Sequence, residues 1–282
     1  MKWIRALVVG GSSAVLSTAM AAGSAGAAIT SATPPGGGVM LRAARPASAP
    51  VVVGNATQEF SSNWSGYAEQ GTKKQFTAVE GTWTVQAAKA STGATYSSDW
   101  VGIDGATNSK LVQDGTEADF YNGAAHYDAW TEIIPAPEVV LAGLSVQPGN
   151  KMEGIVQEVA TNKWTMTVKN LSTGKSASRT VSYTTPEADV EAIHERPEVG
   201  GSLANLAQTA NVTQLPDFYS TAAPGATPVF KDLGVPVGGT TINQIFMTNN
   251  ADTAIIASPS ALNSVKDGFT VADGGTSPPP PR

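Results

Sequence analysis

The chain has 282 residues, of which 41% are hydrophobic and 14% are charged, and it contains no cysteine. The lack of cysteine excludes disulfides, a thiol nucleophile and thiolate metal sites. The formal net charge is −6, and residues 1–57 contain four of the 17 basic residues but no acidic residue, so the remainder is more acidic than the whole. An acidic domain lacks the basic surface that binds nucleic acids or anionic membranes.

The first 27 residues have the features of a secretory signal peptide. Lys2 and Arg5 precede an apolar, alanine-rich stretch, and the Ala-Gly-Ala sequence at 25–27 fits a small-residue cleavage site. Glycines and serines at positions 10–13 leave the stretch short of the ~20 strongly apolar residues of a membrane-spanning helix. We therefore expect a secreted, extracellular protein that has no membrane attachment once the signal is cleaved.

Two further segments lack the pattern of a folded core. Residues 28–57 are rich in Pro, Gly and Ala, and their position after the signal indicates a removable pro-segment or a flexible spacer. Residues 271–282 contain four consecutive prolines and are predicted to form a disordered tail. The folded domain is accordingly predicted to span residues 58–270.

Within that domain the pattern is one of short strands separated by Gly, Asn, Ser and Pro. Apolar and polar residues alternate in 79–85 and in 164–169, where a loop at 170–175 and a partner strand at 177–183 complete a hairpin. Residues 242–248 form a further strand candidate. The segment 186–195 is bracketed by prolines, so we expect it to be extended rather than helical. Many short alternating strands indicate an all-β sandwich or barrel.

Three of the predicted strands carry unusually specific polar faces. In 100–104, alternation places Val101 and Ile103 on one face and Trp100, Gly102 and Asp104 on the other. The segment 111–116 places Gln113 in a strand that is expected to end at Gly115. In 127–133, one face carries Asp128, Trp130 and Glu132. Such faces suit either solvent or a groove for an extended polymer.

Common catalytic schemes fit this sequence poorly. The chain has two histidines, His126 and His194, but no G-x-S-x-G elbow for a serine nucleophile. A second histidine is missing from the spacing that a zinc protease needs, and the D-T-G or D-S-G pair typical of pepsin-like enzymes is absent. We expect both histidines to be exposed or locally hydrogen-bonded, and we expect neither a metal ion nor another cofactor.

Five segments in chain order carry distinctive motifs: 62–67 (SNWSGY), 100–105 (WVGIDG), 111–116 (LVQDGT), 127–132 (YDAWTE) and 191–197 (EAIHERP). Taken in this order, they resemble the glutamic peptidases, or eqolisins, of fungi and bacteria. The resemblance covers roughly residues 60–250, and the lack of cysteine is typical of the bacterial branch.

The resemblance implies a lectin-like β-sandwich of two curved antiparallel sheets, with an active-site cleft on the concave face of one. It also implies that Gln113 and Glu191 are the catalytic pair. The positions that match residues lining or supporting the family's cleft are Trp64, Trp100, Asp104, Asp128, Trp130 and Glu132.

This pair suits amide hydrolysis without a covalent intermediate. Glu191 would take a proton from water and return it to the leaving amine, while Gln113 would donate to the tetrahedral oxyanion. A glutamate with an ordinary pKa near ~4.3 is half ionised only in acid, so an acid optimum is expected. The resemblance therefore implies a secreted monomeric zymogen that cleaves unfolded or extended polypeptides and resists pepstatin.

Some positions depart from the family pattern. Ile134 and Ala192 stand where aromatic residues are common, and either Glu117 or Asp119 could be the acidic residue after the glutamine segment. Glu195 lies four residues after Glu191 on the same predicted face, so alternation alone cannot separate the two glutamates.

Two other functions remain open from the sequence. A non-catalytic, carbohydrate-binding sandwich would also use tryptophans on a sheet face. A glycosidase would need two carboxylates ~5–10 Å apart, but Asp128 and Glu132 lie ~13 Å apart along a strand.

Overall fold

The computed structural model describes residues 38–46 and 56–282. The predicted signal peptide and most of the predicted pro-segment lie outside the described residues. Within the described residues all regular structure is β-strand, which confirms the all-β class, and no helix there is long and apolar enough to cross a membrane.

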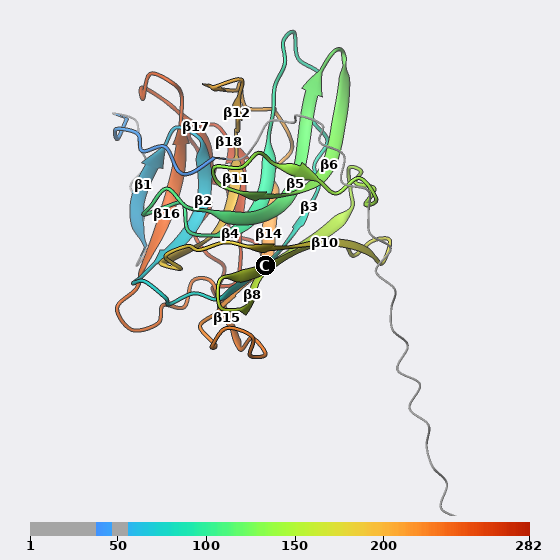
Figure 1. Cartoon of the computed structure of the whole chain (residues 1–282). Coiled ribbons are helices and arrows are strands. Elements are labelled where there is room, and N and C mark those ends of the chain that lie inside the picture. Colours follow the sequence, from blue (N-terminus) through green and yellow to red (C-terminus); the bar gives the residue numbers. More distant parts are fainter. Residues whose placement is uncertain (1–37, 47–55) are drawn as a thin grey trace, which may run out of the picture.

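The strands form two layers that are joined in one continuous, open sheet (Figure 1). The first layer contains, in spatial order, β10 (Lys175–Ser182), β9 (Lys163–Asn170), β8 (Lys151–Ala160), β3 (Ala78–Thr84) and β14 (Val212–Ser220). The second layer contains β16 (Thr241–Thr248), β2 (Trp64–Gln70), β11 (Asp189–Glu195), β4 (Ser98–Ile103), β5 (Val112–Tyr121), β6 (Ala124–Ile133) and β7 (Val139–Val140).

Two central strands connect these layers, and four short strands complete the described structure. The connecting strands are β18 (Phe269–Asp273) and β17 (Ile255–Pro259). β1 (Thr57–Ser61) pairs in parallel with β16, and β15 (Phe230–Asp232) pairs with β14. A separate two-stranded sheet is formed by β12 (Glu198–Val199) and β13 (Ser202–Leu203).

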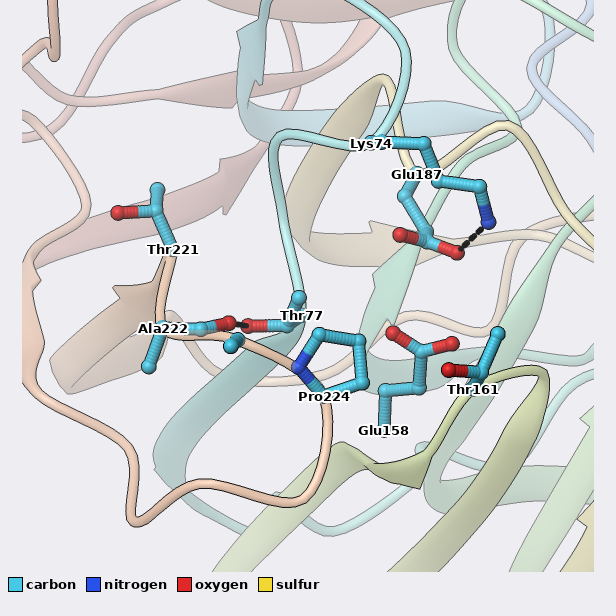
Figure 2. A pocket seen from close by; sticks show the side chains of 9 residues that line it. Lys74, Thr77, Glu158, Thr161, Glu187, Thr221, Ala222 and Pro224 are labelled. Carbon is cyan, nitrogen blue, oxygen red and sulfur yellow. Dashed lines mark hydrogen bonds and ion pairs between the residues drawn. The ribbon is translucent and has the colours of Figure 1, made fainter.

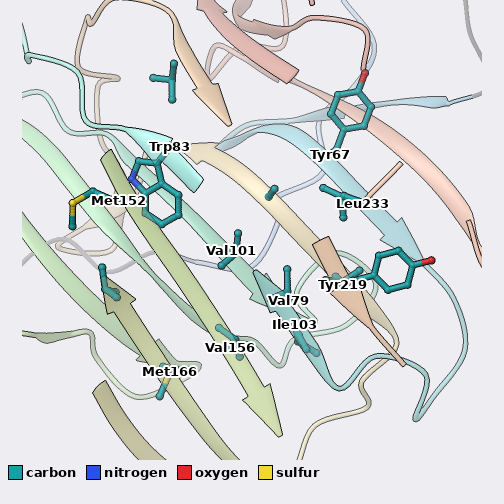
Figure 3. Close-up of a cluster of buried hydrophobic side chains, with 14 of the residues drawn as sticks. Tyr67, Val79, Trp83, Val101, Ile103, Met152, Val156, Met166, Tyr219 and Leu233 are labelled. Carbon is teal, nitrogen blue, oxygen red and sulfur yellow. The ribbon is translucent and has the colours of Figure 1, made fainter. Parts of the chain in front are cut away.

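The layers pack face to face as a β-sandwich, with β3, β8 and β9 lying across β4 and β5. The core between them contains Val101 and Ile103 from β4, Val79 and Trp83 from β3, and Met152 from β8 (Figure 3). Two sheets stacked in this way bury one face of every strand in a common apolar layer. Because one face of the second layer packs in this core, only its opposite face is available for a functional site.

The first layer follows the alternation that its sequence predicts. The predicted hairpin is present as β9 and β10, with Trp164, Met166 and Val168 buried on one face and polar residues on the other. The predicted strands at 79–85 and 242–248 correspond to β3 and β16, and the segment before Pro197 is extended as β11.

The structure differs from the expected fold in three details. The strand expected to end at Gly115 continues to Tyr121, because Gly115 is needed for close approach rather than for a turn. A Cβ at Gly115 would lie 2.5 Å from both the Asp99 carbonyl oxygen and the Trp100 Cβ. The two expected sheets are also hydrogen-bonded into one, through β17 and β18, and β18 extends past the predicted boundary at residue 270.

Candidate active site

The face of the second layer that points away from the core carries three tryptophans, and we call it the tryptophan face. Trp64, Trp100 and Trp130 come from β2, β4 and β6, and all three are fully buried. Trp64 and Trp100 meet edge to face with ring centroids 4.9 Å apart. The alternation predicted this face correctly, since Val101 and Ile103 point into the core. The expected open cleft is instead covered here by other parts of the chain.

A transverse row of paired residues crosses the tryptophan face and contains both predicted catalytic side chains. Glu191 is paired with Gly102, Gly102 with Gln113, and Gln113 with Glu132. Residues directly opposite each other in a sheet project from the same face. The backbones of Glu191 and Gln113 are two strand spacings apart, which is about 10 Å. The structure thus brings the predicted pair to one place from strands distant in sequence.

Gly102 lies between the two predicted catalytic residues, and the side chains of Leu111 and Trp100 pack closely against it. A Cβ at this position would lie 2.9 Å from both Leu111 Cδ1 and Trp100 Cζ3 and 3.2 Å from the Gln113 Cβ. These distances are too short for ordinary contacts, so a larger residue would displace its neighbours. Close packing therefore requires a glycine at position 102, and the sequence alone did not reveal this requirement.

The Gln113 amide is fixed on one side and unpartnered on the other. Its Nε2 donates a 2.6 Å hydrogen bond to Glu132 Oε2, while its Oε1 is buried and accepts no hydrogen bond from the described residues. Burial raises the pKa of Glu132 well above its usual range, and the nearby Glu195 charge adds to this effect. Glu132 therefore orients the amide of Gln113, whose second N–H remains available.

Glu191 is a buried carboxyl group with no fixed role in packing. It is fully buried, and neither oxygen has a hydrogen-bond partner among the described residues. Burial raises its pKa well above the usual range, with smaller contributions from the nearby carboxylates of Asp189 and Asp104. Polar groups left unsatisfied in a native interior are often functional. Such a carboxyl group is suited to bind and activate a water molecule.

The second glutamate of β11 is also fully buried, but it differs from Glu191 in its hydrogen bonding. Glu195 accepts hydrogen bonds from Trp100 Nε1 at 2.7 Å, from Asn63 Nδ2 at 3.0 Å and from the Gly38 amide at 3.1 Å. Burial nevertheless raises its pKa to about 8. These bonds give Glu195 a positioning role, which separates it from Glu191 in a way that alternation could not.

Asp104 lies near the site, but its carboxylate binds the backbone next to the site. Its carboxylate accepts hydrogen bonds from the amides of Glu187 and Ala188 and from the Thr185 hydroxyl, immediately before β11. In the same way, Asp189 accepts hydrogen bonds from the Ala106 amide at 2.7 Å and from Thr107. These two carboxylates fix the loop after β4 against the start of β11. They therefore set the position of Glu191.

Asp128 lies outside the catalytic row, in an acidic group at the outer part of hairpin β5–β6. It is half-buried and paired with Glu117, and both carboxyl groups lie near Asp119 and Glu138. Burial raises the pKa of Glu117, of Asp119 and of Glu138, and the mutual repulsion of the carboxylates adds to this effect. At neutral pH the group would hold unfavourable charge. In acid its members would be neutral.

Sequence reasoning missed Asn63 and Glu138. Asn63 stands in a quoted motif beside Trp64, but an asparagine before a strand ordinarily indicates a turn. Glu138 lies in the loop between β6 and β7, 4% exposed, and nothing in its local pattern predicts burial. The two departures from the family also differ in position, because Ile134 packs against the tryptophan face whereas Ala192 faces the core.

The histidines take no part in the row. His126 stacks on Tyr121 with centroids 3.8 Å apart, and its Nε2 lies 3.3 Å from the Tyr121 carbonyl oxygen. His194 is buried and its Nδ1 lies 2.8 Å from Asp99 Oδ1. Among residues 38–46 and 56–282, no group of three or more potential ligand side chains could hold a metal ion.

A cavity of about 220 Å³ lies elsewhere, where the ends of several strands meet (Figure 2). Its lining includes the ion pair of Lys74 with Glu187, together with Glu158, whose Oε2 is buried without a partner. None of the eight side chains predicted for the site lines it. The cavity is therefore distinct from the tryptophan face.

Comparison with known proteins identifies a family that this chain matches. Residues 62–266 match the model of the Peptidase A4 family. The chain is 30% identical over 184 residues to aspergillopepsin-2 of Aspergillus niger, a match that covers 57% of this chain and 64% of the relative. It is 32% identical over 143 residues to scytalidopepsin B of Scytalidium lignicola, covering 50% of this chain and 53% of the relative. Less than two thirds of either relative is thus spanned.

Solved structures support the fold. The structure of scytalido-glutamic peptidase with a transition-state analogue inhibitor is similar with a TM-score of 0.62 at 21% identity, over 75% of this chain and 98% of that chain. An eqolisin in complex with the tripeptide Ala-Ile-His gives a TM-score of 0.56 at 20% identity, over the same shares.

Proposed function

The chain belongs to the Peptidase A4 family, and on that premise we propose that it is a glutamic endopeptidase that hydrolyses polypeptides with Glu191 and Gln113 as its catalytic pair. One observation carries this proposal. Two buried side chains with unsatisfied oxygen atoms, the Glu191 carboxyl group and the Gln113 amide, lie in one row on either side of Gly102, which has no side chain of its own.

In the proposed reaction, Glu191 acts first as a base. Its carboxylate removes a proton from a water molecule, whose oxygen forms a bond to the carbon of the scissile carbonyl group. The carbonyl electrons move to oxygen, and the available N–H of Gln113 donates a hydrogen bond to that oxyanion. One such donor is worth roughly 3–4 kcal/mol of barrier. The intermediate then collapses, and the protonated Glu191 transfers its proton to the leaving nitrogen as the C–N bond breaks.

The raised pKa of Glu191 bears on when this reaction can run. In the buried state the carboxyl group is held neutral, mainly by desolvation, and cannot act as a base in acid. Entry of water to the tryptophan face would lower the pKa toward its ordinary value. We therefore propose that activity in acid requires exposure of this face, as expected for a secreted zymogen whose pro-segment is removed.

The test is digestion of unfolded casein from pH 2 to 7 by the processed protein, by Glu191→Gln and by Gln113→Ala, with pepstatin present. We expect cleavage only in acid, insensitivity to pepstatin, and a loss of at least about 100-fold in both variants. Glu153→Gln on β8 is the matched control, because it removes a glutamate carboxylate from the first layer. Wild-type activity in Glu191→Gln would remove this residue as the base, and no cleavage by the processed wild type would overturn the proposal.

A further inference from the structure

We infer that the cavity shown in Figure 2 is a binding site for a primary ammonium group on a short alkyl chain, with Glu158 as the residue that binds the charge. The site goes beyond the proposed function, because none of the residues proposed for peptide hydrolysis lines this cavity.

The cavity lies where separate segments of the chain meet, and backbone hydrogen bonds hold its walls. The lining comes from the segment between β2 and β3, from the end of β8, from the residues before β11 and from the segment after β14. The Glu158 amide donates to the Thr77 carbonyl at 2.8 Å, and the Glu158 carbonyl accepts from the Gly225 amide at 3.0 Å. The Glu187 carbonyl accepts from the Gln75 amide at 3.0 Å. Both carboxyl groups of the cavity therefore project from backbone that is held in place.

Glu158 supplies the unsatisfied polar atom of this cavity. The residue is 1% exposed, and its Oε1 accepts from the Asn162 amide at 2.6 Å. Its Oε2 is buried and has no hydrogen-bond partner among the described residues. Figure 2 shows the carboxyl group directed into the space beside Thr161 and Pro224. A buried acceptor without a donor destabilises the folded state, so a ligand that donates a hydrogen bond here would be favoured.

The charges around the cavity leave room for one more cation. Its lining contains two carboxylates but a single basic residue, Lys74, which forms an ion pair with Glu187 and has a side chain that is 55% exposed. Burial raises the pKa of Glu187, the hydrogen bond from Lys74 lowers it, and the charge of Glu158 raises it. The two carboxylates are thus close enough to repel each other. A second cation beside Glu158 would relieve this repulsion.

The walls of the cavity favour an alkylammonium over a metal ion. Ala222, Ala223 and Pro224 form an apolar side, and the volume is about 220 Å³. A cavity of about 150 Å³ already holds benzene, so this space suits a small organic molecule. Within residues 38–46 and 56–282, no group of three or more potential ligand side chains could hold a metal ion.

The single free oxygen of Glu158 also favours ammonium over guanidinium. A guanidinium group pairs best with both oxygens of a carboxylate, but Oε1 of Glu158 is already bonded to the Asn162 amide. An ammonium group has three N–H donors on a flexible carbon chain. One N–H can therefore reach Oε2 while the carbon chain contacts the apolar side of the cavity.

The experiment titrates n-butylammonium chloride into the unprocessed chain at pH 6.5 and follows the amide signals of the protein by NMR. We expect saturable, millimolar binding by the wild type, and binding at least about tenfold weaker by Glu158→Gln, because a hydrogen bond to a charged group is lost. Glu153→Gln, on the same strand but outside the cavity, is the matched control and should bind like the wild type. The neutral analogue 1-butanol should bind the wild type at least about tenfold more weakly.

Lys74→Met tests the inference with a change of opposite sign. It removes the cation that already occupies Glu187, so we expect this variant to bind butylammonium about tenfold more tightly than the wild type. It also keeps the inference testable if melting curves show that Glu158→Gln is unfolded. Binding of inorganic phosphate that is lost in Lys74→Met, without binding of butylammonium, would show an anion site and overturn the inference.

Two sources offer this group, a free amine and the lysine side chain of another protein, and a second probe separates them. N-acetyl-lysine-N-methylamide carries the same ammonium group on a peptide backbone. Similar binding of both probes would support a site that accepts lysine side chains, and binding of butylammonium alone would support a site for free amines. Equal binding by the wild type and a folded Glu158→Gln protein would overturn the inference, and so would binding of calcium but of neither probe.

Discussion

In two regions of the same sheet, side chains alternate between the two faces with a period of two, but the burial of these faces differs. In β8 and β9 buried residues alternate with more exposed ones, and in β10 half-buried residues alternate with exposed ones, as expected when one face meets a core and the other meets solvent. In β11 and β4 every residue is buried, so both faces are covered. The first region follows a general rule for sandwiches. In the second region, the face that points away from the core also carries buried carboxyl and amide groups.

That difference has a cost in stability. A buried polar group without a partner destabilises the folded state by about 1–3 kcal/mol, and a buried charge costs more. Gln113, Glu191, Trp130, Asp119 and Glu138 all have at least one such atom. The proposed catalytic roles would explain the first two. The acidic ones are tolerated if they are protonated, which links the second region to acid pH.

The largest expected effect compares one glycine from each region. Gly102→Ala should lower kcat/KM by about 100-fold, because its Cβ would push against Gln113 and Trp100 in the catalytic row, and shifts of 1 Å can have this effect. Gly154→Ala in β8 would place a Cβ 2.4 Å from Asp114 Oδ1 and should destabilise the protein by about 1–3 kcal/mol through overpacking.

Casein hydrolysis and thermal melting, done on both variants, separate the two outcomes. We expect Gly154→Ala, assayed well below its melting temperature, to retain the wild-type kcat/KM. If Gly102→Ala were fully active, the close packing of Trp100 and Gln113 around Gly102 would have no importance for the proposed reaction.

The sequence predicted which face each strand presents, but not what covers it. Alternation placed Trp100 opposite Val101 because side-chain direction follows from a period of two. The covering residues, among them Met40 and Leu111, come from other parts of the chain, and a local pattern carries no information about them. Alternation could not separate the two glutamates of β11, and only the family motif selected Glu191 from the sequence. In the structure, Glu195 differs because it accepts hydrogen bonds from Asn63, Trp100 and the Gly38 amide.

The next effect in size concerns pH and the whole second region. Burial raises the pKa of Glu195 to about 8 and that of Glu69 to about 7, and it raises those of Glu132 and Glu138. Such groups bind more protons when folded than when unfolded between about pH 4 and pH 8, so the free energy of unfolding falls as pH rises through this range. The melting temperature should be lower at pH 7.5 than at pH 4 by about 10 °C or more.

His194 acts in the same direction. Burial alone would lower its pKa, but the charge and hydrogen bond of Asp99, together with the charge of Asp273, raise it, so the resulting stabilisation is present in acid and is lost as pH rises. Calorimetry across the pH range measures the sum of these effects. A melting temperature that is constant or rises from pH 4 to pH 7.5 would contradict the protonated interior.

Glu138→Gln isolates one member of the acidic group. It removes a carboxylate that Glu117 and Glu132 would repel, so at pH 7.5 it should stabilise the protein by about 1 kcal/mol or more, a rise in melting temperature of roughly 2–4 °C. At pH 3 the carboxyl group is already neutral, and we expect no change. Equal shifts at both pH values would indicate a packing effect instead of charge.

The smallest effect is expected from the same substitution in the first layer. Glu153 of β8 forms an ion pair of 2.5 Å with Lys169 of β9, in which the lysine side chain is 41% exposed. Exposed pairs of this kind contribute about 0.2–1 kcal/mol, and salt weakens them. Glu153 also contributes to the raised pKa of Glu80, after burial, so its removal relieves a repulsion and offsets part of the loss.

Glu153→Gln should therefore lower the melting temperature at pH 7.5 by no more than about 3 °C, and by less in 1 M salt. Changes in melting temperature of opposite sign for Glu138→Gln and Glu153→Gln at pH 7.5 would show that the effect of a carboxylate on stability depends on the layer that carries it. If both variants were destabilised alike, burying a charged carboxylate in the second layer would not destabilise the protein. The two regions would then differ in packing alone.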